Sequence, residues 1–134
     1  MNLAILRVEG PEASLAQLKE LLGLSSDMEW QAGERRRDGS IRESSGLNST
    51  IADAETAERM TNAIREFLMR CEAAEVTFPW QGITAEVDVG FTVGDSTRFA
   101  GGFRLSPSDV RACAECGLGL SVAAYPTSDE ANAT

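Results

Sequence analysis

The stretch of residues 101–125 constrains the fold most, because it carries a boundary signal wherever a helix would begin or end. Ser106 can cap a helix, Pro107 suits the first helical position, and Asp109 would complete a capping box. Gly117 is the residue type that most often ends a helix in a left-handed conformation. Short apolar runs flank this helix, so we predict a strand, a helix and a second strand in that order.

The N-terminal region repeats this plan, with a strand, a helix opened by Pro11 and a stop at Gly23. Residues 83–93 alternate apolar and polar side chains, which indicates a strand with one buried and one solvated face. Asp53 is a candidate cap for a long amphipathic helix. The predicted strands are 3–9, 28–33, 41–44, 83–93, 99–105 and 118–125, the predicted helices are 11–23, 53–71 and 106–117, and 46–50 is predicted as a turn.

This order, strand-helix-strand-strand-helix-strand-strand-helix-strand, predicts an α+β fold. We expect a single domain over residues 1–126, with a mixed or mainly antiparallel sheet of about six strands and helices on one face. The similar strand-helix-strand plan at the two ends suggests a pseudo-symmetric arrangement. Residues 127–134 are small and polar, and we predict a flexible tail there.

The net charge of −9 over 134 residues limits the classes of function. It argues against a nucleic-acid partner, because a phosphate backbone would be repelled, and it would attract a basic protein partner. Solubility is the alternative explanation of the same charge. The apolar run at the N-terminus is too short for a membrane span or a secretory core, and three cysteines predict no disulfide framework. We therefore predict a cytoplasmic protein without a membrane partner.

The strand at 83–93 is predicted to carry a charged face. Glu86 and Asp88 lie two residues apart and therefore point to the same side of the sheet. If the following strand folds back as an antiparallel hairpin, Arg98 and Arg104 join this face, with Arg104 near Glu86. Structural cross-strand pairing is the favoured interpretation, and the alternative is that this face docks a partner.

The residue inventory gives little support for catalysis. The chain has no histidine, so the commonest general base is missing. Glu86 and Asp88 could act as paired carboxylates, but an exposed face with arginines nearby favours solvated charges. Cys113 and Cys116 match a C-x-x-C motif, yet they fall in the last turn of a predicted helix, where the dipole disfavours a thiolate. We predict no catalytic residue, no metal and no cofactor, and a non-enzyme is favoured over an enzyme.

The one basic run consists of Arg35, Arg36 and Arg37, at the tip of a predicted hairpin with Arg42 nearby. Arginine binds carboxylates and phosphates well, but charged tips also protect strand edges, so a solvated hairpin is the favoured interpretation. An exposed Trp30 or Trp80 beside this tip would instead mark a binding hot spot.

Motifs spread over residues 3–126 resemble a known family. They are Leu22-Gly23-Leu24, Trp30 with Gly33, the long amphipathic helix, Gly90-Phe91, the run Gly101-Gly102-Phe103-Arg104-Leu105-Ser106-Pro107, and Gly117-Leu118-Gly119-Leu120 on to Tyr125. In these the chain is similar to the bacterial domain of unknown function family numbered 4279. The resemblance implies a single cytosolic α+β domain without a catalytic residue. The chain departs from the family at 44–48, which lacks a second tryptophan, and at Ala123, where an acidic residue is usual.

Two classes of function remain. The first is a small acidic binding protein, most concretely an immunity or inhibitor protein, which masks a basic protein partner with Glu86 and Asp88. The second is a small-ligand-binding protein or carboxylate-based enzyme, in which these two carboxylates and the arginines Arg98 and Arg104 line a pocket. A deep charged pocket would favour the second class and a flat acidic face the first. A homo-oligomer formed through a sheet edge is a third alternative.

Overall fold

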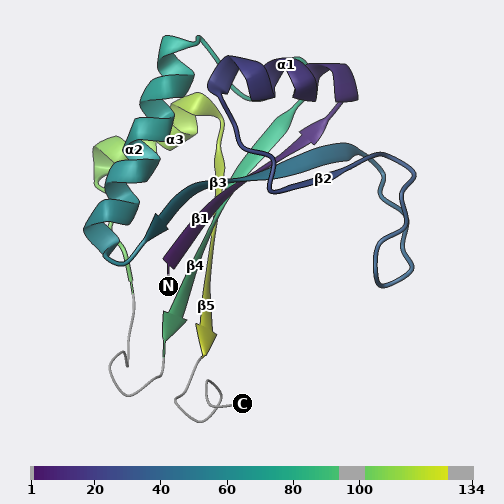
Figure 1. Cartoon of the computed structure of the whole chain (residues 1–134). Coiled ribbons are helices and arrows are strands. Elements are labelled where there is room, and N and C mark those ends of the chain that lie inside the picture. Colours follow the sequence, from purple (N-terminus) through teal and green to yellow (C-terminus); the bar gives the residue numbers. More distant parts are fainter. Residues whose placement is uncertain (1, 94–101, 127–134) are drawn as a thin grey trace.

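The computed structural model describes residues 2–93 and 102–126 of the chain (Figure 1). These residues form five strands and three helices of an α+β fold. The strands are β1 (Asn2–Gly10), β2 (Met28–Trp30), β3 (Ser45–Ala54), β4 (Thr84–Val93) and β5 (Gly119–Pro126), and the helices are α1 (Glu12–Leu22), α2 (Ala57–Ala73) and α3 (Pro107–Cys116). In this part of the chain no helix has the length and apolar character that crossing a membrane requires.

A single mixed sheet organises the molecule, with the strand order β2-β3-β1-β4-β5. The pairs β2/β3, β3/β1 and β1/β4 are antiparallel, whereas β5 runs parallel to β4. The elements from β1 to β4 follow the β-α-β-β-α-β order of the split βαβ motif. Helix α3 then returns the chain so that β5 is added beside β4 at the outer edge.

The three helices begin and end where local chemistry favours it. Pro11 precedes α1 and Gly23 ends it in a left-handed conformation. In α3 both hydrogen bonds of the capping box join Ser106 and Asp109, which confirms the sequence prediction. Gly117 ends α3 with φ of 75°, and a Cβ there would collide with the carbonyl oxygen of Phe78, so only glycine fits.

All three helices lie on one face of the sheet (Figure 1). Alternate residues of the central strand β1, namely Ala4, Leu6 and Val8, are fully buried beneath them. The long helix α2 contributes its predicted apolar stripe, including Phe67 and Ile64, to the same core. The opposite face of the sheet carries no helix among the described residues. The side chains that alternate with the buried ones along each strand point to this face.

The predicted strand at 99–105 is wrong for the part that the structure describes. Residues 102–105 form no strand, and 94–101, like the predicted tail at 127–134, lie outside the described residues. The neighbours of β4 are β1 and β5 instead of a following hairpin strand. Six strands in the predicted order are therefore not observed.

The predicted turn at 46–50 is also wrong, because these residues lie inside β3. Position 46 has no room for a side chain, because the ring of Trp30 lies against Gly46. Ser49 is buried, and its hydroxyl is hydrogen-bonded to that of Ser25 at 3.0 Å. Asp53 belongs to β3, and Thr56 caps α2 in its place. The small and polar residues of 46–50 therefore reflect close packing inside β3, and not a turn.

The two ends of the chain are not structurally equivalent. After α1, the chain enters β2, which is separated from β1 by β3. After α3, the chain enters β5 directly beside β4. The similar local signals at the two ends therefore lead to different placements in the sheet, and they do not create a symmetric pair of units.

Candidate functional site on the open face of the sheet

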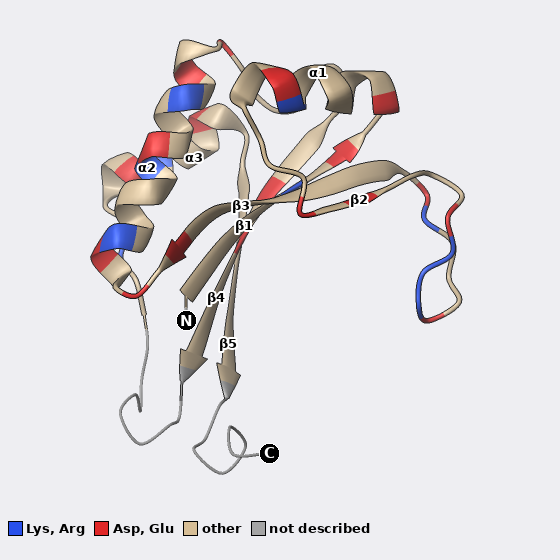
Figure 2. Cartoon of the chain, viewed as in Figure 1, with Lys and Arg blue, Asp and Glu red and all other residues tan. Residues whose placement is uncertain are grey.

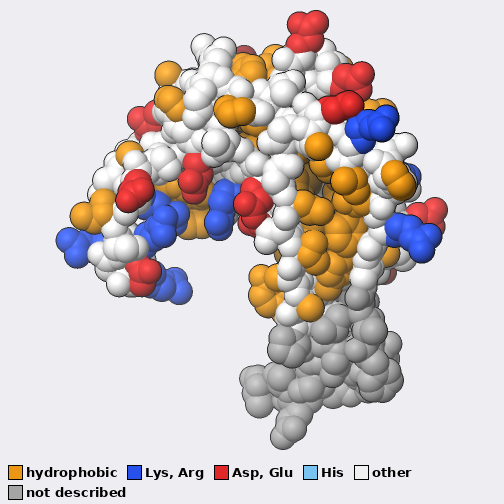
Figure 3. Space-filling model, turned by 180° about the vertical axis from the view of Figure 1, so that it is seen from behind, with side chains coloured by type: hydrophobic (Ala, Val, Ile, Leu, Met, Phe, Trp, Pro, Cys, Tyr) orange, Lys and Arg blue, Asp and Glu red, His pale blue; other side chains and the backbone are white. Residues whose placement is uncertain are grey.

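The open face of the sheet holds a hollow of about 580 Å³ formed by β1, β4 and β5. Charged and apolar side chains share its lining: Leu3, Ile5, Arg7, Glu86, Asp88 and Tyr125. Strand pairing brings these residues together, since Arg7 stands opposite Glu86, and Ile5 opposite Asp88. Seen from behind, acidic and basic side chains border the recess beside the sheet, and apolar side chains reach the surface next to it (Figure 3).

The central chemical feature of the hollow is the carboxylate pair Glu86 and Asp88. Hydrogen bonding with Asp88, partial desolvation and repulsion from its charge raise the pKa of Glu86, while the positive charge of Arg7 opposes the shift. Glu86 therefore takes up a proton more readily than an isolated glutamate would. A bound cation would relieve the same repulsion, so the pair is suited to an ammonium or guanidinium group.

Apolar surface surrounds this acidic pair. Leu3 and Ile5 are half-buried on β1, and Tyr125 of β5 is 59% exposed. The ring of Tyr125 lies over Gly90, where a Cβ would come within 3.1 Å of its Cε2 atom. The site thus combines a negative centre with an apolar border, which suits a cationic group carried on an apolar stem.

The structure brings together only part of the predicted site. Glu86 and Asp88 lie side by side as expected, but Arg104 lies in the helical layer, where its carbonyl accepts the Thr61 hydroxyl hydrogen bond at 2.9 Å. The predicted Glu86–Arg104 pair is therefore wrong, because the strand that would have carried Arg104 is absent at 102–105. Arg98 lies outside the described residues.

The arginine opposite Glu86 is Arg7, which was not among the predicted site residues. A signal was present, because Arg7 alternates with the apolar Leu6 and Val8 and must therefore point away from the core. Its neighbour could not be inferred, since only the strand order places β1 beside β4.

The basic run lies on a projecting arm formed by residues 31–44 (Figures 1 and 2). Arg35, Arg36 and Arg37 are exposed there, and an isolated antiparallel bridge between Arg35 and Ile41 closes the predicted turn. The predicted strand at 41–44 is wrong, because only Ile41 forms a bridge there, and the strand predicted at 28–33 ends at Trp30 and pairs with β3. At the base of the arm, the guanidinium carbon of Arg42 lies 4.3 Å from the ring centroid of Trp30.

Trp30 is buried, with only 4% of its surface exposed. Its ring packs against Gly46 and beneath Arg42, so it holds the arm to the sheet. The prediction of Trp30 as an exposed binding residue is therefore wrong.

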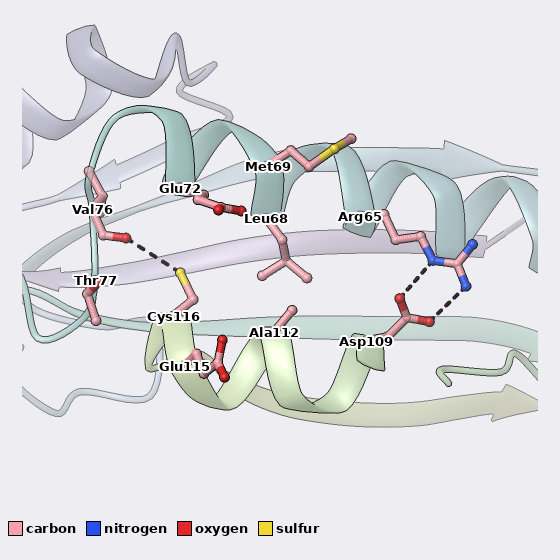
Figure 4. Close-up of a pocket in the computed structure, with 10 residues that line it drawn as sticks. All are labelled: Arg65, Leu68, Met69, Glu72, Val76, Thr77, Asp109, Ala112, Glu115 and Cys116. Atoms are coloured by element: carbon pink, nitrogen blue, oxygen red, sulfur yellow. Dashed lines mark hydrogen bonds and ion pairs between the residues drawn. The ribbon is translucent and has the colours of Figure 1, made fainter. Parts of the chain in front are cut away.

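A second cavity, of about 470 Å³, lies between α2 and α3 (Figure 4). At one end, the Nε and Nη2 atoms of Arg65 donate to Asp109 at 2.7 and 2.8 Å. This pairing, with the Ser106 backbone bond, holds the pKa of Asp109 well below its usual range. Because Asp109 also caps α3, the ion pair fixes that helix against α2 and has a structural explanation.

The cysteines meet in the same inter-helix region. Interaction with the thiol of Cys116 and burial both raise the pKa of the Cys71 thiol. Cys116 in turn donates to the carbonyl of Val76 at 3.7 Å. All three cysteines are free, and the described residues contain no cluster of three metal-ligating side chains. The sulfur contact therefore joins Cys116 to α2 and not to Cys113.

No family model matches the sequence, and comparisons with curated proteins and with solved structures also give no match. The similarity to the family numbered 4279 stays a prediction from the motifs alone.

Proposed function

We propose that this chain is a small acidic binding protein that masks a basic protein partner, as an immunity or inhibitor protein does. The observation that supports it is the carboxylate pair Glu86 and Asp88 in an uncovered hollow with apolar borders. The pair has a raised Glu86 pKa, so it carries repulsion that a cationic side chain would relieve. Membership of the family numbered 4279 and a cytoplasmic location form part of this proposal.

Binding would proceed by charge complementarity followed by burial. The net charge of −9 accelerates the approach of a basic protein, and this contribution weakens with added salt. A lysine or arginine of the partner then lies between Glu86 and Asp88, and its aliphatic stem contacts Leu3 and Tyr125. The partner loses access to its basic surface, so inhibition follows from steric and electrostatic masking.

The pH dependence of this binding has a defined sign. Since the pKa of Glu86 is raised, protonation of the free protein begins at a higher pH than for an ordinary carboxyl group. The protonated pair has less charge to offer a cation. Affinity for the partner should therefore fall as the pH is lowered toward and through the range in which Glu86 takes up its proton.

A second candidate function is small-ligand binding or carboxylate-based catalysis. The volume of about 580 Å³ favours it, because small-molecule sites span roughly 300–1,000 Å³. A raised pKa on one of two adjacent carboxylates is also typical of acid-base sites. This candidate predicts that small cationic compounds bind in the hollow without any protein partner.

The test is affinity capture with the full chain from the native host, followed by binding measurements with the purified partner at low and physiological salt. The double variant Glu86→Gln/Asp88→Asn removes the pair's charge. The matched control is Glu58→Gln/Glu66→Gln, which removes the same charge from exposed positions of α2. We expect the first variant to weaken binding at least about tenfold, since charge-assisted contacts are lost, and the control to change it little.

Two results would contradict the proposal. Capture of no protein at either salt concentration would remove the masking function, and titration with small cations monitored by NMR would then test the second candidate. Equal weakening by both double variants would show that total charge, and not the hollow, attracts the partner.

A further inference from the structure

The outer edge of the sheet at β5 is exposed and chemically unprotected. Strand β5 is the last in the sheet order, and no described strand pairs with its outer side. Its sequence, from Gly119 to Pro126, contains no charged residue. Leu120 and Val122 are 44% and 54% exposed, and Tyr125 is exposed on the other face. A long, uncharged edge with apolar side chains is the arrangement that pairs with another strand.

The opposite edge shows how the same sheet protects itself. Strand β2 has three residues, and its Glu29 forms an ion pair with Lys19 at 3.0 Å. The arm continues from β2, and Arg42 covers the ring of Trp30. Short length and charge are common protections of an edge strand. Neither is present along β5, which is eight residues long.

We infer that β5 pairs with β5 of a second copy, so that two molecules form one continuous sheet. A two-fold axis makes such an interface self-complementary, because the same strand meets itself in the antiparallel direction. With the axis at Val122, this residue faces its own copy and Leu120 faces Ala124. The apolar side chains that one molecule leaves exposed would thus cover each other.

Charge explains why a second copy can approach at this edge. Each copy carries a net charge of −9, so most approaches are repulsive. The acidic pair Glu86 and Asp88 lies on β4, one strand inward from this edge. Three strand spacings separate β4 from its copy, or about 14 Å at ~4.8 Å each. This exceeds the Debye length of about 8 Å at physiological salt, so the edge can pair there.

The salt dependence therefore has the opposite sign to that of the proposed partner binding. Added salt screens the repulsion between two copies, and the dimer should be stronger at physiological salt than at low salt. Binding of a basic partner should weaken over the same change. Dimerisation and binding of a basic partner can therefore be detected or excluded independently of each other.

Sedimentation equilibrium of the full chain over a wide concentration range tests this inference. We expect a monomer–dimer equilibrium that Val122→Lys weakens at least about tenfold, because it places like charges opposite each other across the axis. Leu120→Lys should weaken it less, since its new charge faces Ala124. The matched control is Met69→Lys, which changes an apolar side chain of similar exposure, 59%, on α2.

Hydrogen exchange identifies the strand involved. In the wild-type dimer, amide protection along β5 should rise with protein concentration, while that of β2 should not. Circular dichroism verifies that each variant is folded. A wild-type monomer at every concentration, a dimer insensitive to both lysine variants of β5, a dimer weakened by salt, or dimerisation without added protection of β5 would each overturn the inference.

Discussion

The two faces of the sheet are built from the same strands and differ in what their alternate residues meet. On the covered face, Leu6 and Val8 of β1 lie in a closed apolar core beneath the helices. On the open face, Arg7 lies between them in sequence and stands opposite Glu86. Side chains on the covered face are packed away from water, whereas charged side chains on the open face remain partly unpaired. The difference separates residues that specify the fold from residues that remain free to bind.

The largest expected effect belongs to the covered face. Phe67 of α2 is fully buried, so Phe67→Ala removes packed volume and should reduce the free energy of unfolding by about 3–5 kcal/mol. Its neighbour Glu66 is exposed, and Glu66→Ala should change the value by no more than about 0.5 kcal/mol. Urea unfolding measures both. Equal effects of the two substitutions would contradict the distinction between core and surface on this helix.

Gly46 tests whether part of the open face is packed as tightly as the core. In Gly46→Ala the new Cβ would lie 2.6 Å from Trp30 Cε2 and from the Val8 carbonyl oxygen. The ring or the strand must shift, so we expect a loss of about 1–3 kcal/mol and a change in tryptophan fluorescence. Gly102→Ala is the control, because among the described residues beyond its chain neighbours a methyl group there would meet no atom within 4 Å. A neutral Gly46→Ala would mean that the contact between Trp30 and β3 is loose.

Replacing the buried carboxylate of Asp109, on the helical side of the sheet, should change stability by an intermediate amount. Asp109 is paired with Arg65, and its pKa is held below the usual range. A lowered pKa stabilises the folded protein at neutral pH, and this contribution is lost as the pH falls below the ordinary carboxyl range of about 4. We therefore expect Asp109→Asn to destabilise the protein at neutral pH, with a difference from wild type that shrinks on acidification. Denaturant unfolding as a function of pH measures the difference, and a constant difference would contradict the ion-pair explanation.

The sequence predicted elements whose signals are local. Ser106, Pro107 and Gly117 define α3 without help from distant residues, and the alternation in β4 identifies its buried face. The prediction failed where distant contacts decide. Gly46 and Ser49 resemble turn residues, but Trp30 and Ser25 make them strand residues.

The candidate site was predictable in the same limited way. The pairing of Glu86 with Asp88 follows from their spacing on one strand, so it required no knowledge of topology. The position of Arg7 opposite Glu86 depends on β1 lying next to β4, and that of Tyr125 depends on β5 lying on the other side. Strand order is a property of the whole chain, which local patterns do not contain.

The smallest expected effect lies on the open face and has the opposite sign to that of Asp109. Because the pKa of Glu86 is raised, the stability of the folded protein decreases as the pH rises through the range in which this group loses its proton. Glu86→Gln should therefore increase stability slightly at neutral pH, within about 0.5 kcal/mol because the group is exposed and screened. The gain should vanish below about pH 4, where the glutamate is protonated in both the folded and unfolded states. Glu66→Gln on the outer surface of α2 serves as the control, and the same gain in both variants would attribute the effect to net charge and not to the carboxylate pair.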